Sequence, residues 1–119
     1  MPTELAVVRA AYALNLELAS RVEKFPRHQR AGLGADLTGH ARDILGHLLR
    51  AKFATADEKP ALLNEANVAL ELLRFLLRLA ADLRAYPVTA HGHVLRLADD
   101  VGRQVGGWLR AIKTKGGGS

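Results

Sequence analysis

Three arginines, Arg96, Arg103 and Arg110, recur at intervals of seven residues near the C-terminus. Seven residues make close to two turns of an α-helix, so the three side chains share one helix face and span about 21 Å. The opposite face carries apolar side chains: Val94, Val101, Val105, Trp108 and Ile112. A guanidinium stays charged and offers a planar fork of N–H donors, which suits phosphate groups. The spacing therefore predicts an arginine row (Arg96, Arg103 and Arg110) that contacts nucleic-acid phosphates.

The overall charge also favours a polyanionic partner. Seventeen Lys and Arg residues against twelve Asp and Glu residues give a formal net charge of +5. Nucleic acid is the leading polyanion for a small basic protein. Six further cations are candidate phosphate contacts, although the sequence does not show which of them share a surface: Arg27, Arg30, Arg50, Lys52, Arg74 and Arg78. The alternative is a solvated helix whose arginines pair with Asp99 and Asp100 and whose charge serves solubility.

A second polar stripe consists of Asp36, His40, Asp43, His47 and Arg50, spaced four, three, four and three residues apart. His and Asp side chains on one helix face can ligate a metal, but a site needs three or four converging ligands and groups that orient them. We interpret the stripe as a hydrogen-bonded or ion-paired helix face. A metal-binding or catalytic bundle is the alternative. We expect neither a metal nor a cofactor.

No arrangement of residues typical of an active site is found. The chain has no cysteine, and its only serines are Ser20 and Ser119. Its glycines follow neither of the phosphate-loop patterns that precede a helix. The sequence shows no nucleophile paired with a base, so we expect a protein that is not an enzyme.

Three proline-containing breaks divide the chain, because proline suits a turn or the first turn of a helix better than a helix interior. They lie at Phe25-Pro26, around Pro60 and at Tyr86-Pro87. Apolar residues recur at intervals of three and four between the breaks, which is typical of helices, and no window alternates as a strand would. We expect helices at about 3–24, 27–53, 58–84 and 89–113. Short connections between helices of similar length predict an antiparallel up-down four-helix bundle.

Length and composition indicate one domain in a reducing compartment. The 119 residues fit a single domain, which we place at residues 1–115. The closing residues, 116–119, resemble a linker remnant and are left out of the fold prediction. Glu4 and Arg9 interrupt the first apolar stretch, so we expect neither a signal peptide nor a membrane span. With no cysteine, the expected compartment is the cytoplasm.

The third predicted helix is more apolar than one bundle core requires. Its polar side chains form a single narrow stripe: Asn64, Asn67, Glu71, Arg74, Arg78 and Asp82. Leu72, Phe75 and Leu79 lie among the apolar residues on the remaining sides, and the first predicted helix is similarly apolar. We therefore predict a subunit interface. The alternative is a monomer whose loops and termini cover the excess.

Glycines in the second predicted helix also repeat on one face, at Gly32, Gly39 and Gly46. Glycine costs a helix about 1 kcal/mol relative to alanine, so the stripe suggests close approach by another helix or a ligand. Compositional bias of the genome is the alternative explanation.

Two segments resemble a known family. They are Lys24-Phe25-Pro26-Arg27-His28-Gln29-Arg30 followed by Leu33-Gly34, and Val101-Gly102-Arg103-Gln104-Val105-Gly106-Gly107-Trp108-Leu109-Arg110. With the four-helix layout, they resemble the accessory variability determinant (Avd) of diversity-generating retroelements. The Phe-Pro turn is shared with the wider group of four-helix-bundle proteins encoded in ribosomal RNA intervening sequences. The resemblance covers residues 3–113.

The resemblance implies a basic homopentamer of four-helix bundles, arranged as a barrel. Such a protein associates with the retroelement's reverse transcriptase and its structured template-repeat RNA, with DNA or cDNA as a further nucleic-acid ligand. It is an accessory subunit in mutagenic retrohoming, and the polymerase chemistry belongs to its partner. Gly106, Gly107 and Trp108 are then packing or oligomer residues, and Trp108 lies on the apolar face as a packing anchor. The alternative is an intervening-sequence type of bundle that acts as a structural interaction protein without an RNA role.

Overall fold

The protein is an all-α chain in the computed structural model, which describes residues 2–117. The helices are α1 (Pro2–Val22), α2 (Arg27–Gln29), α3 (Ala35–Phe53), α4 (Lys59–Asp82) and α5 (Val88–Gly117), and a π-helical turn, η1 (Arg30–Gly34), joins α2 to α3. No strand occurs among residues 2–117. The predicted all-α class is confirmed.

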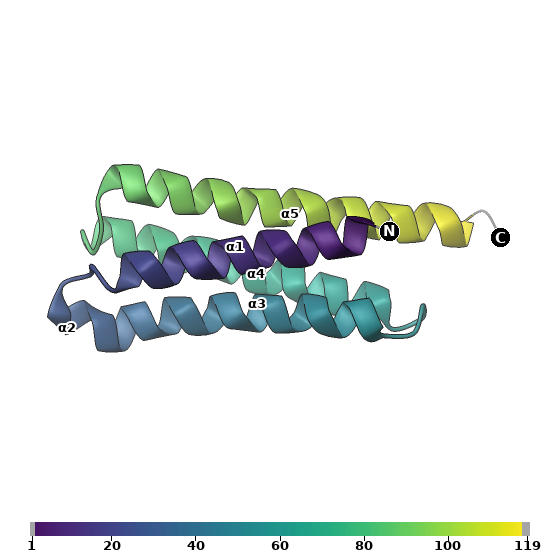
Figure 1. Ribbon diagram of the computed structural model, residues 1–119, viewed down its shortest axis with the longest axis horizontal. Coiled ribbons are helices and arrows are strands. Elements are labelled where there is room, and N and C mark those ends of the chain that lie inside the picture. Colours follow the sequence, from purple (N-terminus) through teal and green to yellow (C-terminus); the bar gives the residue numbers. More distant parts are fainter. Residues whose placement is uncertain (1, 118–119) are drawn as a thin grey trace.

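The four long helices lie side by side in an elongated bundle measuring 53 × 22 × 20 Å (Figure 1). The chain reverses direction at each connection, so consecutive long helices are antiparallel. Contacts join α1 to α3, α3 to α4, α4 to α5 and α5 to α1. This order places α1 and α4 at diagonal corners of the bundle, and α3 and α5 at the other two corners. It is the up-down four-helix bundle that the sequence predicts.

The core is formed by side chains that repeat at intervals of three and four on every long helix. The largest include Leu14 and Leu18 on α1, Ile44 and Leu48 on α3, Leu70, Leu73 and Leu77 on α4, and Val94 and Val101 on α5. Each fully buried leucine or isoleucine contributes roughly 1.5–3 kcal/mol. Among the residues that the structure describes, no charged side chain is buried, and the polar hydroxyl of Tyr86 is buried with hydrogen-bond partners.

The second predicted helix differs from the prediction at its start. One helix was expected over 27–53, but the chain forms the three-residue α2 and then η1 before α3 begins at Ala35. Gly34 explains part of the difference, because a Cβ there would lie 2.6 Å from Val22 Cγ1. The chain passes close to the end of α1 at a position where only glycine fits. Two glycines within five residues also weaken an ordinary α-helix, and π-helical turns occur where the regular helix is interrupted.

The last helix is longer than predicted. It was expected to end near residue 113, but α5 continues to Gly117. The predicted linker at 116–119 therefore begins inside α5, and residues 118–119 lie outside the described part of the chain. None of the described helices combines the length and the apolar character needed to cross a bilayer.

Candidate nucleic-acid interface

The arginine row lies on the outer face of α5, opposite the core. Arg96, Arg103 and Arg110 are all exposed, and the buried side of the same helix carries Val101 and Trp108. Arg103 Nη2 lies 2.8 Å from Asp100 Oδ1, yet the Arg103 side chain remains 72% exposed. Arg96 and Arg110 form no ion pair with the described residues. The row therefore presents three accessible guanidinium groups.

Glycines lie beneath two of these guanidinium groups. A Cβ added at Gly92 would be 3.6 Å from Arg96 Nη1, and one at Gly106 would be 3.4 Å from Arg110 Nη1. A Cβ at Gly107 would meet only Arg110, at 3.8 Å. No other helix of the chain packs on Gly106 or Gly107, which leaves their backbone open to an external partner. Trp108, in contrast, is only 3% exposed and belongs to the core.

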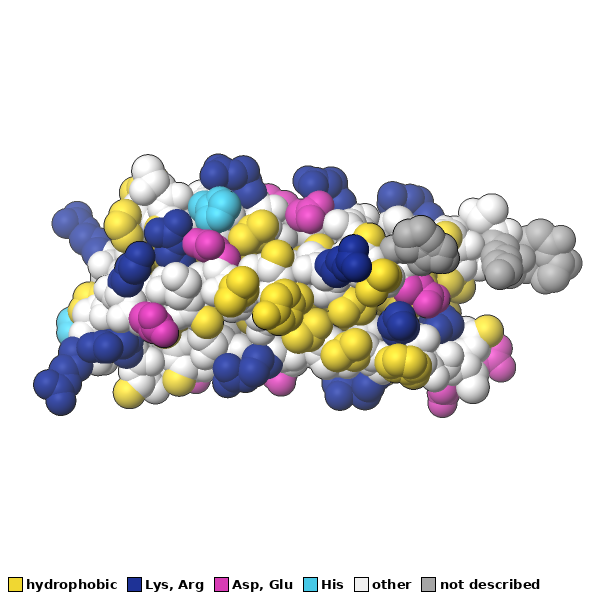
Figure 2. Space-filling view, in the orientation of Figure 1, with side chains coloured by type: hydrophobic (Ala, Val, Ile, Leu, Met, Phe, Trp, Pro, Cys, Tyr) yellow, Lys and Arg dark blue, Asp and Glu magenta, His cyan; other side chains and the backbone are white. Residues whose placement is uncertain are grey.

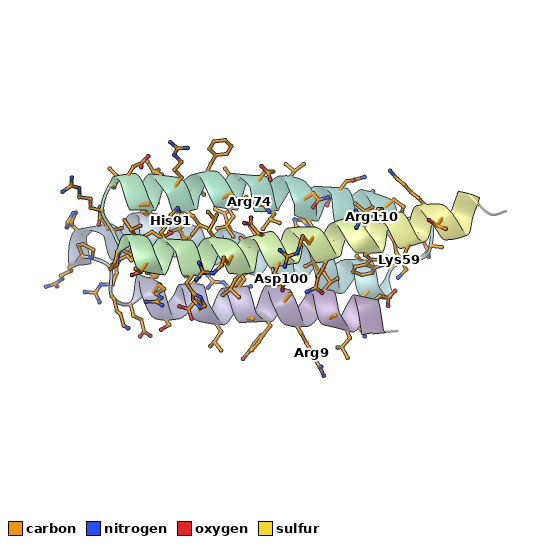
Figure 3. All side chains as sticks on the ribbon, turned by 90° about the horizontal axis from the view of Figure 1, so that it is seen from above. Arg9, Lys59, Arg74, His91, Asp100 and Arg110 are labelled. Carbon is orange, nitrogen blue, oxygen red and sulfur yellow. The ribbon has the colours of Figure 1, made fainter. Side chains whose placement is uncertain are left out.

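Arg74 lies in the seam between α4 and α5 and is already neutralised (Figure 3). Its Nε lies 3.1 Å from Asp99 Oδ1, and its Nη1 contacts Glu71 Oε1. Gly102 permits this arrangement, because a Cβ there would lie 2.7 Å from Arg74 Nη2. Arg74 connects two helices of the bundle and does not extend the arginine row.

The remaining predicted cations fall on other surfaces. Arg78 is 75% exposed on α4, with Asp82 3.8 Å away. Arg50 and Lys52 are on α3, diagonally across the bundle from α5. Arg50 Nη2 lies 3.2 Å from His47 Nδ1, and Lys52 Nζ lies 4.8 Å from the centre of the Phe53 ring. These residues do not form one surface with the arginine row.

The stripe of Asp36, His40, Asp43 and His47, for which a metal site was the alternative interpretation, does not converge on one point. His47 Nδ1 lies 3.6 Å from Glu65 Oε2 of α4, while Asp36 and Asp43 are exposed. No group of three or more potential metal ligands is found among the residues described. Gly39, from the glycine stripe of the same helix, is also uncovered. A Cβ added at Gly39 would have no atom within 4 Å, so no other helix of the chain packs closely on this glycine.

A second basic surface, which the sequence did not predict as a unit, lies at the end of the bundle where α1 ends and α5 begins. We call this the basic end; it consists of Lys24, Arg27, Arg30 and Arg84, all exposed. None of the four forms an ion pair with the described residues. Figure 2 shows basic side chains gathered at this end of the molecule. Lys24 and Arg84 were missed because they lie 60 residues apart in separate connections, and only the folded chain brings those connections together.

Contacts between the two connections hold the basic end in place. Gln29 Nε2 donates a hydrogen bond to Leu83 O at 3.3 Å, and the rings of Phe25 and Tyr86 have centroids 5.4 Å apart. The Tyr86 hydroxyl donates to Leu77 O at 3.3 Å and lies 2.7 Å from His91 Nδ1. Burial raises the pKa of Tyr86 to about 12. The α1–α2 and α4–α5 connections therefore pack against each other and form a platform beneath the four cations.

Arg84 adopts an unusual backbone conformation in this platform. Its φ is 57°, the only positive φ of a non-glycine residue among those described. The Arg84 N–H donates to Ala81 O at 3.0 Å, and the Ala85 N–H donates to Ala80 O at 2.8 Å. This is the Schellman pattern that ends many helices, usually with glycine at the left-handed position. An L-residue there costs roughly 1–2 kcal/mol.

Two apolar surfaces are exposed on opposite sides of the bundle. The surface on α4 includes Phe75, whose side chain is 70% exposed, and Leu72 and Leu79, which are nearly half exposed. The surface on α1 includes Tyr12 and Leu16, which are 59% and 61% exposed. Figure 2 shows apolar side chains across the α1 side, and Figure 3 shows α1 and α4 at opposite edges with α5 between them. The arginine row thus occupies a face between two apolar ones.

A comparison with protein-family models identifies one match, to a family described as bAvd-like, over residues 12–112. The chain belongs to the bAvd-like family. The match covers most of the bundle, from the second half of α1 to the C-terminal part of α5, and it includes both the arginine row and the basic end. The predicted resemblance to Avd is confirmed. No curated protein matched the chain.

Membership in the bAvd-like family suggests an accessory role in diversity-generating retroelements. Accessory proteins of this type are non-catalytic and act with other retroelement components. The geometry agrees with a binding role, because the accessible features of this bAvd-like chain are charged and apolar surfaces.

Proposed function

We propose that this bAvd-like chain is an accessory subunit that binds nucleic acid through the arginine row and self-associates through its apolar faces. Its protein partner is the retroelement's reverse transcriptase, and its nucleic-acid ligand is the structured template-repeat RNA, with cDNA as a further ligand. The complex supports mutagenic cDNA synthesis and retrohoming. The single observation that carries the nucleic-acid part is the row of three exposed arginines on one face of α5.

The composition of this face favours phosphate over a protein ligand. Between and beside the arginines lie Gly92, Asp99 and Gly106, and no large apolar side chain interrupts the row. Phosphate contacts need accessible donors and positive charge, whereas protein interfaces usually have an apolar centre. We therefore expect binding that depends on charge and shape more than on base sequence.

The apolar faces support an oligomer of a definite kind. Because α1 and α4 are diagonal, their exposed residues point in opposite directions and cannot both meet their own copies in one two-fold interface. A head-to-tail contact, with α4 of one copy against α1 of the next, covers both faces, and it closes into a ring when each copy is also rotated relative to the one before it. Family resemblance gives the number of copies as five.

The α5 face stays open in such a ring, because neither of the two contacts uses it. The arginine rows of successive copies would then be repeated around the assembly, which increases the affinity for a long RNA through multivalency. A reverse transcriptase bound to the same RNA would be held beside the ring.

The arginine row can be tested directly with the triple variant Arg96→Glu, Arg103→Glu, Arg110→Glu. We expect its affinity for a structured RNA hairpin to fall at least tenfold at low salt, because three phosphate contacts are lost and replaced by repulsion. A control variant, Arg42→Glu, reverses an exposed cation on α3 and should bind nearly as well as wild type. Equal affinity of the triple variant and wild type would exclude the row as the RNA site.

The partner is tested by co-expression with the reverse transcriptase of the same retroelement. We expect the two proteins to co-purify, including after nuclease treatment if they touch directly. Failure to co-purify with or without RNA would contradict the accessory-subunit proposal.

A further inference from the structure

We propose that the basic end (Lys24, Arg27, Arg30 and Arg84) is a second phosphate-binding site of the chain, separate from the arginine row. Its ligand is the phosphate backbone of a nucleic acid. The inference rests on the proposed function only in assuming that the chain binds nucleic acid. The site itself is argued from its own residues.

The first argument is the lack of carboxylate partners. Arg21, Arg74 and Lys59 have a carboxylate oxygen within 4 Å, whereas Arg96 and Arg110 of the arginine row have none among the described residues. The four cations of the basic end have none among the described residues. Four unpaired like charges on one end repel each other, and an anion bound between them relieves that repulsion.

The second argument is the rigidity of the platform. The Gln29 to Leu83 hydrogen bond and the Phe25–Tyr86 ring contact join the α1–α2 connection to the α4–α5 connection. Gly34 packs so closely on Val22 that a methyl group would not fit. Cations on a fixed backbone lose less conformational entropy when they bind a ligand, which favours a preorganised site.

The backbone conformation of Arg84 also indicates a functional role for its side chain. Arg84 is the left-handed residue of the Schellman motif that ends α4. Glycine would adopt this backbone conformation without strain. An arginine therefore occupies a position at which the fold alone favours glycine. Strained residues of this kind often have a functional reason, and here the side chain adds the fourth positive charge.

The basic end and the arginine row lie on different parts of the bundle. The row runs along the length of α5, whereas the connections that carry the basic end lie at one end of the bundle (Figure 1). In a ring of parallel bundles, all copies would present their basic ends on one rim. A nucleic acid could then cross from the rim to the sides of the ring, or one strand could occupy each site.

The test measures the basic end in a chain whose arginine row has been removed. The Arg96→Glu, Arg103→Glu, Arg110→Glu chain is titrated with fluorescent 20-nucleotide oligouridine across a salt series, with and without Arg27→Glu and Arg30→Glu. We expect residual binding that the two added changes weaken at least tenfold at low salt. The slope of log affinity against log salt should fall by about 1.4, since each phosphate contact contributes about 0.7 on a single strand. The control, Arg42→Glu in the same background, should stay within twofold.

A second variant, Arg84→Gly, separates binding from folding. We expect it to raise the thermal unfolding midpoint, because the backbone strain is relieved, and to lower oligouridine affinity in the same background.

Oligodeoxythymidine of equal length distinguishes an RNA ligand from a DNA ligand. Equal dependence of both strands on Arg27 and Arg30 supports a site for phosphate itself, and dependence of oligouridine alone supports an RNA site.

The outcomes distinguish the two proposals. If wild type binds and the arginine-row variant is weakened, the proposed function stands whatever happens at the basic end. If Arg27→Glu with Arg30→Glu then has no larger effect than the control, the basic end is not a nucleic-acid site and the inference is overturned. No oligouridine binding by wild type would overturn the inference about the basic end alone, whereas no binding of the structured RNA hairpin by wild type would overturn the proposed function.

Discussion

The exposure that remains after ion pairing decides which arginines of this chain are available to a ligand: the side chain of Arg74 is 27% exposed and that of Arg103 is 72% exposed. Arg74 and Arg103 are both in helices and both were candidate phosphate contacts, yet Arg74 is held by Glu71 and Asp99 in a helix seam, whereas Arg103 remains 72% exposed. The sequence placed Arg96, Arg103 and Arg110 on one face because helical periodicity alone determines that. The sequence does not show that Arg74 is less accessible than these three arginines, because its ion-pair partner Asp99 lies on another helix.

Trp108 is the single residue whose removal should cost the fold most. It is the only tryptophan and is almost fully buried at 3% exposed. We expect Trp108→Ala to lower the free energy of unfolding by about 3–5 kcal/mol, from lost burial and the cavity left behind. Circular dichroism during urea unfolding measures this at fixed protein concentration, without relying on tryptophan fluorescence. Val88→Ala, at a residue 84% exposed, should change stability by less than about 0.5 kcal/mol; equal losses would contradict the packing role.

Tyr86 should make the fold sensitive to alkaline pH. Its pKa is raised from 10.0 to about 12 by burial, so between these values the unfolded chain loses the hydroxyl proton while the folded chain keeps it. The stabilising contribution is therefore complete below pH 10 and is lost as pH rises from 10 to 12. We expect Tyr86→Phe to reduce the fall in unfolding free energy over that range. An identical pH profile for the variant and wild type would show that the buried hydroxyl does not cause it.

At the scale of helices, two glycines on the second predicted segment should respond in opposite ways to alanine. An added Cβ at Gly34 meets Val22 Cγ1 at 2.6 Å, whereas one at Gly39 has no atom within 4 Å. We expect Gly34→Ala to destabilise by about 1–3 kcal/mol through overpacking. Gly39→Ala should stabilise by up to about 1 kcal/mol through helix propensity. Thermal unfolding of both variants gives the comparison, and the steric explanation is wrong if Gly34→Ala is the more stable one.

Periodicity predicted the long helices, and it failed where contacts between connections decide the structure. The 3–4 spacing of residues such as Leu70, Leu73 and Leu77 locates α4 and its buried face without any tertiary information. The π-helical turn before α3 depends on how closely Gly34 meets Val22, which no local pattern reports. The basic end likewise depends on the contact between Phe25 and Tyr86.

At the scale of the whole molecule, the exposed apolar residues of α4 should control assembly. We expect wild type to be an oligomer by light scattering, and Phe75→Glu with Leu79→Glu to give a folded monomer of 12.9 kDa. The physical reason is that two charges replace the centre of a face that would be buried in the ring. Thr89→Glu, an exposed change at the start of α5, should leave the mass unchanged. A wild-type mass of one chain would exclude the ring.

The arrangement of surfaces on the whole bundle explains how one small chain can serve a larger complex. The exposed apolar residues of α1 and α4 lie on other helices than the arginine row of α5, and in the proposed assembly the row and the basic end stay accessible. Family membership gives this arrangement its setting in a retroelement. Binding of nucleic acid by charge is the claim on which the whole account depends.

The most direct test is the affinity of purified wild-type protein for a structured RNA across a salt series. The account predicts a linear fall of log affinity with log salt and a steep slope, because several arginines replace counterions on the phosphates. Affinity that does not change with salt, or no binding even at low salt, would contradict it. The chain would then be a protein-only scaffold whose positive charge serves solubility.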